Sequence, residues 1–358
     1  MTGDAVVFED VSKRFGALTA LDHVSLQIRR GEMFGLIGPD GAGKTTAIRL
    51  ACGLLRPDGG RIRMGDRDPV KDHRAITGMI GYLSQRFSLY GDLSIDENIA
   101  FQAEIHAVRD YAAERDRLLA LTQLTPFRAR RADRLSGGMK QKLALACTLI
   151  HRPDVLLLDE PTTGVDPVSR REFWKLLSEF LAGGLTIVMA TPYLDEAERC
   201  ARVALLHEGR VMALDEPSRL QASLPGTLIE VEAAGMRPPV ETLAAIPAVE
   251  DVQLFGDRAH VRLRPRNDDG VQYLTEALRQ AAVPVTSVRP IPASLEDVFI
   301  HLVSRSPASE RSERATGAER GMGPPRAPAF ARSASARSRR SSSGGGSVQG
   351  GPGDEVPR

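Results

Sequence analysis

Short apolar runs alternate with helix-like patterns along the first two thirds of the chain. Residues 33–37, 155–158 and 186–190 are runs of four or five residues without a charge, as in strands buried on both faces. Stretches with a helical spacing of apolar residues separate them. This alternation is typical of an α/β layer fold. We therefore predict an α/β first domain over residues 1–225.

The pattern changes in residues 226–303, where we predict a smaller second domain. Short elements follow one another there as strand, helix, strand, strand, helix, strand and a final short helix. Their predicted ranges are 228–233, 240–246, 249–255, 258–263, 271–281, 284–288 and a helix from Ser294. This order suggests a small α+β domain of ferredoxin-like type.

Residues 304–358 form a tail in which Ser, Arg, Gly, Pro and Ala dominate, and Phe330 is its only aromatic residue. Such a segment buries too little apolar surface to offset the entropy of ordering, so we predict disorder. The tail carries a net charge of +5, which leaves −4 for residues 1–303 of a chain with a total of +1. A mildly acidic body argues against a broad duplex-binding face, so we expect no specific nucleic-acid partner.

Three further features restrict the class of protein. No run approaches the ~18–20 consecutive apolar residues of a membrane-spanning helix. The first ten residues are polar and acidic, unlike a secretory signal. Cys52, Cys147 and Cys200 lie far apart, with neither a disulfide pattern nor metal-ligand spacing. We therefore expect a protein of the reducing cytoplasm rather than a membrane-spanning or secreted one.

The first predicted strand leads into a phosphate-binding loop. Residues 38–45 read Gly-Pro-Asp-Gly-Ala-Gly-Lys-Thr, and a helical pattern follows. Glycines let successive backbone N–H groups face phosphate oxygens, and the helix dipole adds favourable charge. Lys44 is expected to reach the β- and γ-phosphates, Thr45 to hold Mg²⁺, and Asp40 to face solvent. The expected nucleotide contacts are Gly38, Pro39, Asp40, Gly41, Ala42, Gly43, Lys44, Thr45 and Thr46.

The apolar run 155–158 ends in two adjacent carboxylates, Asp159 and Glu160. Charges at the end of a buried strand need partners. Mg²⁺ is the natural partner for Asp159. Glu160 is expected on the other side of the strand, where it can polarise an attacking water as a general base. Beside the phosphate loop, this pair indicates that the bound nucleotide is hydrolysed.

Residues 135–141, Leu-Ser-Gly-Gly-Met-Lys-Gln, precede a predicted helix. Ser136 is a suitable N-cap, and Gly137 and Gly138 suggest a close backbone approach. The hydroxyl and free N–H groups at this helix start make a second anion site. An N-capped helix with a glycine turn explains the segment equally well. Because one ATP cannot use both sites of one compact domain, head-to-tail dimerisation is the economical arrangement.

Together these motifs resemble those of the nucleotide-binding subunits of ABC transporters, in the family's order. The matching positions are Phe15 for adenine stacking, residues 38–45 for the Walker A loop, Gln85 for the Q-loop, residues 135–141 for the signature, Asp159 and Glu160 for Walker B and its catalytic Glu, and Asp166 for the D-loop.

The resemblance implies ATP and Mg²⁺ as ligands and a second nucleotide-binding subunit, the same chain or a related one. It assigns catalysis to Glu160, Lys44 and Gln85, and Mg²⁺ binding to Thr45, Gln85 and Asp159. By the same resemblance, Ser136, Gly137, Gly138 and Asp166 contact ATP held by the partner.

More narrowly, the chain resembles ATPase subunits of ABC-2-type exporters, the drug and multidrug group. Residues 162–167, 193–198 and 294–299, the last reading Ser-Leu-Glu-Asp-Val-Phe, are phrased as in that group. The small C-terminal domain is also usual there. This implies an ABC-2-type transmembrane permease as partner and a peripheral place on the cytoplasmic side of the inner membrane. The sequence does not name the cargo.

One position departs from the family, which places a switch His after the strand at 186–190. Pro192 stands there in this chain. Thr191 is expected to N-cap a helix with Pro192 at its first position. Proline has no side-chain donor for the γ-phosphate, so we expect slow hydrolysis.

Other interpretations stay open at this point. In the segment 84–107, Phe87, Leu89 and Tyr90 are either exposed for a helix of the membrane subunit or packed inside the helical lobe. Rival functions are a soluble ABC ATPase acting on nucleic acid or the ribosome, a P-loop kinase or GTPase, and a slow-hydrolysing regulatory subunit. The segment 135–141 argues against a kinase, and Glu160 argues against a subunit that only binds nucleotide.

Overall fold

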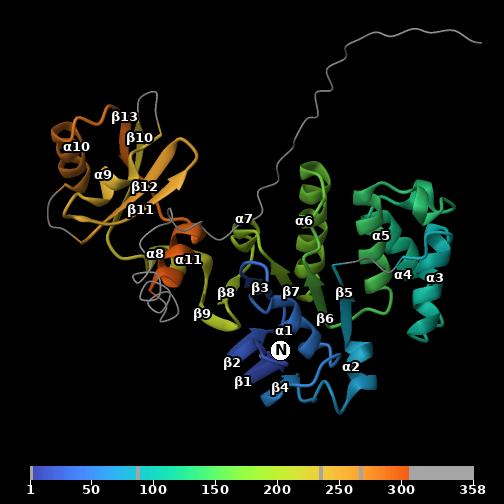
Figure 1. Cartoon of the computed structure of the whole chain (residues 1–358). Coiled ribbons are helices and arrows are strands. Elements are labelled where there is room, and N and C mark those ends of the chain that lie inside the picture. The colour runs from blue at the N-terminus through green and yellow to red at the C-terminus, as the bar shows by residue number, and fades with distance from the viewer. Residues whose placement is uncertain (1–2, 86–88, 234–236, 266–268, 306–358) are drawn as a thin grey trace, which may run out of the picture.

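The computed structural model describes residues 3–85, 89–233, 237–265 and 269–305 (Figure 1). Its largest sheet has six strands in the order β5-β6-β7-β3-β8-β9. They are β3 (Met33–Ile37), β5 (Ile80–Leu83), β6 (Val155–Asp159), β7 (Thr186–Thr191), β8 (Arg202–His207) and β9 (Arg210–Asp215). The first five are parallel, and β9 pairs antiparallel with β8. The predicted α/β fold is confirmed, with β3, β6 and β7 on the three apolar runs.

A second, antiparallel sheet has the order β2-β1-β4. Its strands are β1 (Asp4–Phe15), β2 (Leu18–Arg29) and β4 (Gly59–Met64). Helix α1 (Lys44–Ala51) contacts strands of both sheets. Its buried Ile48 shares one core with Phe8 of β1 and Phe34 of β3. The helix that follows the phosphate loop is therefore fixed between two sheets.

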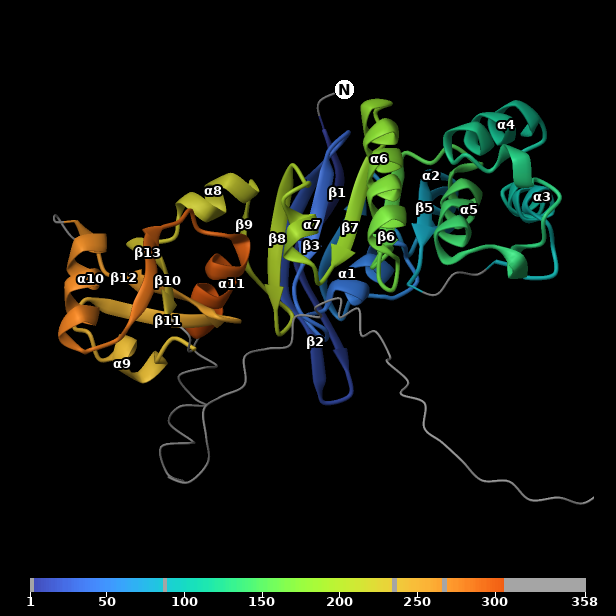
Figure 2. The same ribbon diagram turned by 90° about the horizontal axis from the view of Figure 1, so that it is seen from above.

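Further helices cover the main sheet and extend beyond its β5 edge. Helix α6 (Pro167–Ala182) and the short α7 (Leu194–Ala197) lie on the sheet, whereas α3 (Ile95–Ile105), α4 (Ala112–Leu121) and α5 (Gly137–Leu149) form a helical region (Figures 1 and 2). The remaining helices of this part are α2 (His73–Met79), α8 (Pro217–Ala222) and two 3-10 turns at Thr125–Phe127 and Ala132–Arg134. Ser94 starts α3 with a capping box to Glu97. We call residues 3–222 the main body.

The C-terminal unit lies on the β9 side of the main sheet, opposite the helical region (Figure 2). It comprises β10 (Thr227–Ala233), α9 (Val240–Ala244), β11 (Val249–Phe255), β12 (Arg258–Leu263), α10 (Gly270–Gln280) and β13 (Val285–Pro290). The sheet is antiparallel in the order β11-β12-β10-β13. The element order is the predicted one, and Leu274 and Leu278 of α10 are buried in its core.

The last helix, α11 (Leu295–Ser304), joins the two parts of the molecule. It starts at Ser294 with a capping box to Asp297, where the sequence predicts a helix start. Leu295, Val298 and Phe299 belong to the core of the main body, not to that of the C-terminal unit. On another side of the helix, a carboxylate oxygen of Asp297 lies 2.9 Å from the His260 ring of β12. The sequence places α11 in the second domain, but its apolar side chains pack on the first.

Two predictions concern what the described residues do not contain. In the part of the chain that the structure describes, no helix has the length and apolarity needed to cross a bilayer. The predicted disorder of residues 304–358 falls almost wholly on 306–358, which lie outside the described ranges.

Candidate nucleotide-binding site

The phosphate loop lies between the end of β3 and the start of α1, packed against its surroundings. At Gly38, a Cβ would lie 2.2 Å from the carbonyl oxygen of Leu206 in β8. At Gly43, where φ is +101°, it would lie 2.4 Å from the carbonyl oxygen of Ala20 in β2. Only glycine fits at both positions, so the loop backbone lies close to β8 and β2, in the kind of glycine-dependent conformation that suits phosphate binding.

Lys44 is the cation of this loop, and its side chain is only 4% exposed. Its Nζ donates to the carbonyl oxygens of Gly38 at 2.8 Å and Pro39 at 3.0 Å. It also lies 3.6 Å from the carboxylate of Glu160. Burial lowers the pKa of Lys44, and the nearby carboxylates, Glu160 first, partly offset this effect. The ammonium group is thus held at the loop, next to the candidate base. Asp40 is exposed, as predicted.

Two oxygen groups at the loop fit a magnesium ion. The Thr45 hydroxyl donates to a carboxylate oxygen of Asp159 at 2.9 Å, and Asp159 is 1% exposed. The Tyr82 hydroxyl is 3.4 Å from the other oxygen of Asp159. Mg²⁺ is usually held by one or two protein oxygens together with substrate phosphates and waters. Thr45 and Asp159, brought together from α1 and β6, match that donor set.

Glu160 lies one residue past β6 in the left-handed region, with φ +51°. Its backbone N–H donates to the carbonyl oxygen of Ala190 in β7 at 2.9 Å. The Gln85 amide donates to its carboxylate at 3.0 Å. The Thr163 hydroxyl is 3.4 Å away and was not identified from the sequence. The structure therefore brings Lys44, Gln85 and Glu160 together.

Phe15 ends β1 at the tip of the β1–β2 hairpin and is 47% exposed. The Lys13 ammonium lies 5.5 Å from its ring centroid. The hairpin is close to the phosphate loop, because Gly43 packs against Ala20 of β2. An exposed aromatic face beside a phosphate site suits a nucleotide base.

The contacts of the segment at the start of α5 are with its own helix and with α6. Ser136 caps α5 by accepting the Met139 N–H, as predicted, and Gly137 is exposed with open space around its Cα. The close approach expected for Gly138 occurs within the chain, since a Cβ there would lie 2.3 Å from the Ser169 hydroxyl of α6. Asp166 caps α6, accepting from its first backbone N–H groups. The hydrogen bonds found for Ser136 and Asp166 thus run to their own helices.

The predicted helix start at Pro192 is wrong. Strand β7 runs through Thr191, and α7 begins at Leu194 with Tyr193 as its N-cap. The Thr191 hydroxyl instead accepts the Tyr193 N–H at 3.1 Å and donates to Glu196 at 2.7 Å, closing a turn before the helix. Pro192 is buried at the strand end.

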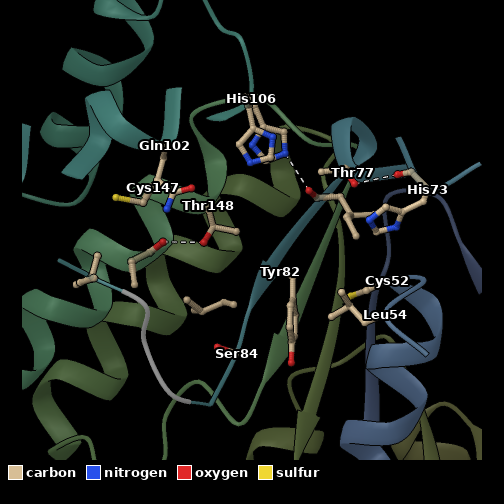
Figure 3. Close-up of a pocket in the computed structure, with 15 residues that line it drawn as sticks. Cys52, Leu54, His73, Thr77, Tyr82, Ser84, Gln102, His106, Cys147 and Thr148 are labelled. Carbon is tan, nitrogen blue, oxygen red and sulfur yellow. Dashed lines mark hydrogen bonds between the residues drawn. The ribbon is translucent and has the colours of Figure 1, made fainter. Parts of the chain in front are cut away.

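A groove of about 300 Å³ is lined by residues of α2, β5, α3 and α5 (Figure 3). Leu89 lines it and packs on the main-body core, Tyr90 is 47% exposed, and Phe87 lies outside the described residues. The rings of His106 and His151 stack at 3.7 Å in the groove, a pair not noticed in the sequence. Burial lowers the pKa of His151 to about 4, and His106 adds to the shift.

A buried lysine on a glycine loop, a threonine–carboxylate pair for a metal and a general base at the carboxyl ends of a parallel sheet define a P-loop nucleoside triphosphatase. The family model described as "ABC transporter" matches residues 21–163. A second, "ATP-binding protein DrrA1-3-like, C-terminal domain", matches residues 216–303. Together with the relatives below, these matches show that the chain belongs to the ATP-binding proteins of ABC transporters.

Among curated relatives, the chain is 38% identical over 315 residues to the probable multidrug ABC transporter ATP-binding protein YbhF of Escherichia coli. That match covers 86% of the chain but 54% of the relative, so the chain spans about half its length. The daunorubicin resistance ATP-binding protein DrrA3 of Streptomyces coeruleorubidus is 35% identical, with 84% and 96% covered. The Nod factor export ATP-binding protein I of Paraburkholderia xenovorans is 35% identical, with 84% and 97% covered.

Solved structures agree with this family. An ATP-binding subunit of an ABC transporter superposes with a TM-score of 0.56 at 29% identity, covering 61% of this chain and 92% of that one. The cbiO1 protein of Clostridium perfringens, part of the transporter complex cbiONQ, gives 0.57 at 28% identity, covering 62% and 91%.

Proposed function

We propose that this chain is the ATP-binding and ATP-hydrolysing motor subunit of an ABC exporter. The observation that carries the proposal is the cluster of Lys44, Gln85 and Glu160 beside the Thr45–Asp159 pair. It combines a phosphate-binding cation that is ion-paired with a base and, beside them, a pair of oxygen groups suited to a metal. The names of the drug-resistance and export relatives support the transport role.

In this proposal the loop N–H groups and Lys44 bind the β- and γ-phosphates of ATP. Thr45 and Asp159, with a contact from Gln85, would hold Mg²⁺, which would supply positive charge beside these phosphates. Glu160 accepts a proton from the attacking water, and Gln85 and Thr163 orient its carboxylate. Phe15 stacks on the adenine, and the remaining loop residues from Gly38 to Thr46 surround the phosphates.

We further propose that two subunits bind ATP between them. Ser136, Gly137, Gly138 and Asp166 of one subunit would face the phosphate loop of the other. The exposure of Ser136, Gly137 and Asp166 supports this arrangement. ATP then closes the pair, because ligand shared across an interface stabilises the assembled state.

The partner in the membrane is, in this proposal, an ABC-2-type permease that docks on the groove lined by Leu89 and the stacked histidines. Exposed apolar side chains near the groove support it, since Leu54 is 55% and Tyr90 47% exposed. The subunit would then sit on the cytoplasmic side of the inner membrane. Residues 1–225 would be the ATPase domain, 226–303 an accessory domain and 304–358 a C-terminal tail.

Slow turnover is part of the proposal, because Pro192 cannot donate a hydrogen bond to the γ-phosphate. This position also favours a second candidate, a regulatory subunit whose own site hydrolyses slowly while its signature segment completes the site of a related partner.

The nucleotide site is tested by Lys44→Ala. Loss of the ammonium removes a charge-assisted bond to phosphate, so we expect the affinity for ATP to fall at least about tenfold. A fluorescent ATP analogue titrated into the purified full chain measures this. Lys71→Ala is the matched control, because the Lys71 side chain is 82% exposed and pairs with Asp68 away from the loop. Wild-type affinity in Lys44→Ala would contradict the proposal.

The dimer is tested by disulfide crosslinking of Asp40→Cys with Gly137→Cys in one chain. The three native cysteines are buried, so they leave a low background. With Glu160→Gln to retain ATP, we expect ATP-dependent dimers on oxidation. Asp40→Cys with Lys71→Cys should give none. Crosslinks that form equally well without ATP, or that never form, would refute the head-to-tail arrangement.

A further inference from the structure

A buried carboxylate of the main body has no role in the mechanism above. Glu196 of α7 is 1% exposed, and each of its oxygens accepts a hydroxyl bond. Thr162 donates at 2.5 Å and Thr191 at 2.7 Å, and both threonines are fully buried. The Arg170 guanidinium of α6 lies 3.8 Å from the same carboxylate. Three separate segments therefore meet at one buried anion.

Two of these segments hold the candidate base. Thr162 lies two residues after Glu160 in the chain. Thr191 ends β7 next to Ala190, whose carbonyl oxygen accepts the backbone N–H of Glu160. The backbone of Glu160 is therefore fixed at two places. Its own N–H is hydrogen-bonded to Ala190 of β7, and Thr162, two residues later, is hydrogen-bonded to Glu196. A shift of either threonine would move the Glu160 backbone.

The third segment is α6, the helix that begins directly after Asp166. Arg170 stands four residues beyond Asp166, and its guanidinium also lies 4.9 Å from the Tyr193 ring centroid. Helix α6 also contacts α5. Ser169 of α6 packs against Gly138 of α5, and Glu172 of α6 forms a 2.6 Å ion pair with Lys142 of α5. Glu196 is therefore linked on one side to the segments around Glu160, through the two threonines, and on the other to α6, through Arg170. In the proposed dimer, α5 and α6 begin at the residues that face the partner's nucleotide.

The energetics make this cluster rigid. Hydrogen bonds to a charged acceptor are about twice as strong as neutral ones. Removing one partner of a buried charge leaves it uncompensated, which is strongly unfavourable. The two threonine hydroxyls are therefore held in one geometry.

We propose that Glu196 is a positioning residue for ATP hydrolysis, which fixes Glu160 through Thr162 and Thr191. In this proposal it acts through the two threonines rather than on the nucleotide itself. The inference rests on the proposed role of Glu160 as the base. It predicts a loss in the rate of the chemical step with nucleotide affinity retained, because the phosphate loop makes no contact with Glu196.

The test is Glu196→Gln in the full chain, which keeps the shape but loses the charge. We expect single-turnover hydrolysis to slow at least tenfold, with the affinity for a fluorescent ATP analogue within twofold of wild type. Glu198→Gln is the matched control on the same turn, since Glu198 is exposed and its carboxylate accepts from Gln221. This control should hydrolyse ATP as wild type does.

Thr191→Val separates positioning from simple loss of folding, because it removes one hydroxyl and leaves Glu196 charged. It should also slow hydrolysis and keep affinity. Combined with Glu196→Gln, it should add less than twofold, because both changes weaken the Thr191–Glu196 bond. An additive effect would overturn the inference, and so would equal losses of rate and affinity, which indicate general disruption.

The two proposals fail in different ways. If wild type shows no hydrolysis that Glu160→Gln removes, the proposed function fails and this inference falls with it. If Glu160→Gln abolishes hydrolysis but Glu196→Gln and Thr191→Val both hydrolyse at the wild-type rate, only the inference about Glu196 is overturned.

Discussion

Pro192 is buried at the end of β7, beside the turn that Thr191 makes toward α7. The proline ring has no hydrogen-bond donor or acceptor. Ala190, two residues earlier, is hydrogen-bonded to the backbone of the candidate base Glu160. Pro192→His would introduce a ring nitrogen at this place. We expect the ATPase rate to rise roughly tenfold, since a donor aimed at developing phosphate charge contributes at least that much. Steady-state phosphate release measures it.

Pro192→Ala is the control for this change. It removes the ring and supplies no donor, so its rate should stay near that of wild type. Equal rates in Pro192→His and wild type would show that the departure from the family at this position has no kinetic effect.

His151 gives a pH dependence of stability. Its Nε2 lies 2.9 Å from the Ile80 carbonyl oxygen, and its buried Nδ1 has no partner among the described residues. Its pKa is lowered from 6.5 to about 4 by burial and by the facing His106, whose own pKa burial also lowers. Between pH 6.5 and 4 the unfolded chain binds a proton that the folded chain does not. The free energy of unfolding therefore falls as the pH falls through this window.

His151→Gln should remove that contribution. Between pH 7 and pH 5, wild type should lose up to about 2 kcal/mol more stability than the variant. Urea unfolding at the two pH values measures the difference, and Gln can still donate to Ile80. Equal losses in both proteins would contradict a neutral, buried His151.

Residues that act through a sequence motif could be predicted, whereas those that act through distant contacts could not. Lys44, Thr45 and Asp159 lie in motifs whose spacing fixes their chemistry, and the structure brings them together. Thr163 and Glu196 lie in segments that resemble the exporter group, but the resemblance assigns no role to either side chain. Their role depends on β6, β7 and α7 meeting in space.

Among the helices, α5 and α6 meet where Gly138 faces Ser169. Gly138→Ala would put its Cβ 2.7 Å from the Ser169 Cβ, which no rotamer change relieves. We expect the helices to separate at a cost of about 1–3 kcal/mol, typical of overpacking. Thermal unfolding of the full chain would show a lower Tm.

Gly137→Ala is a matched control one residue away, where a Cβ meets nothing within 4 Å. Alanine favours a helix over glycine by about 1 kcal/mol, so this variant should be as stable as wild type or more so. Ser169→Gly should restore the stability of Gly138→Ala. If both glycine variants behave alike, helix propensity rather than packing explains Gly138.

The local sequence pattern predicts the strands of the C-terminal unit well, but it predicts the start of α7 wrongly. The ranges of β11 and β12 agree with the prediction residue for residue. The start of α7 does not, because Thr191 is a good cap in isolation, but the buried Glu196 binds its hydroxyl. A tertiary contact thus overrode the local preference.

At the scale of the whole molecule, α11 attaches the end of the described chain to the main body. Phe299 is fully buried in the main-body core, where its ring packs edge-on to His207 of β8. Phe299→Ala should destabilise the main body by about 3–5 kcal/mol. Leu278→Ala, in the core of the C-terminal unit, should act on that unit instead.

Limited proteolysis followed by mass spectrometry distinguishes the two variants. Phe299→Ala should expose cleavage sites in β8 and α8, and Leu278→Ala sites in β10–β13. Identical cleavage patterns would mean that the two parts unfold together. The sequence could not predict this division, because α11 follows the C-terminal unit directly and its capping box says nothing about which core it joins.

The place of α11 also bears on how the protein is made. A ribosome delivers Leu295, Val298 and Phe299 only after the whole C-terminal unit, yet these side chains complete a core begun by residues before 222. A nascent chain that has passed α8 therefore still exposes an apolar face. The main body reaches its final packing only after the C-terminal unit has been synthesised.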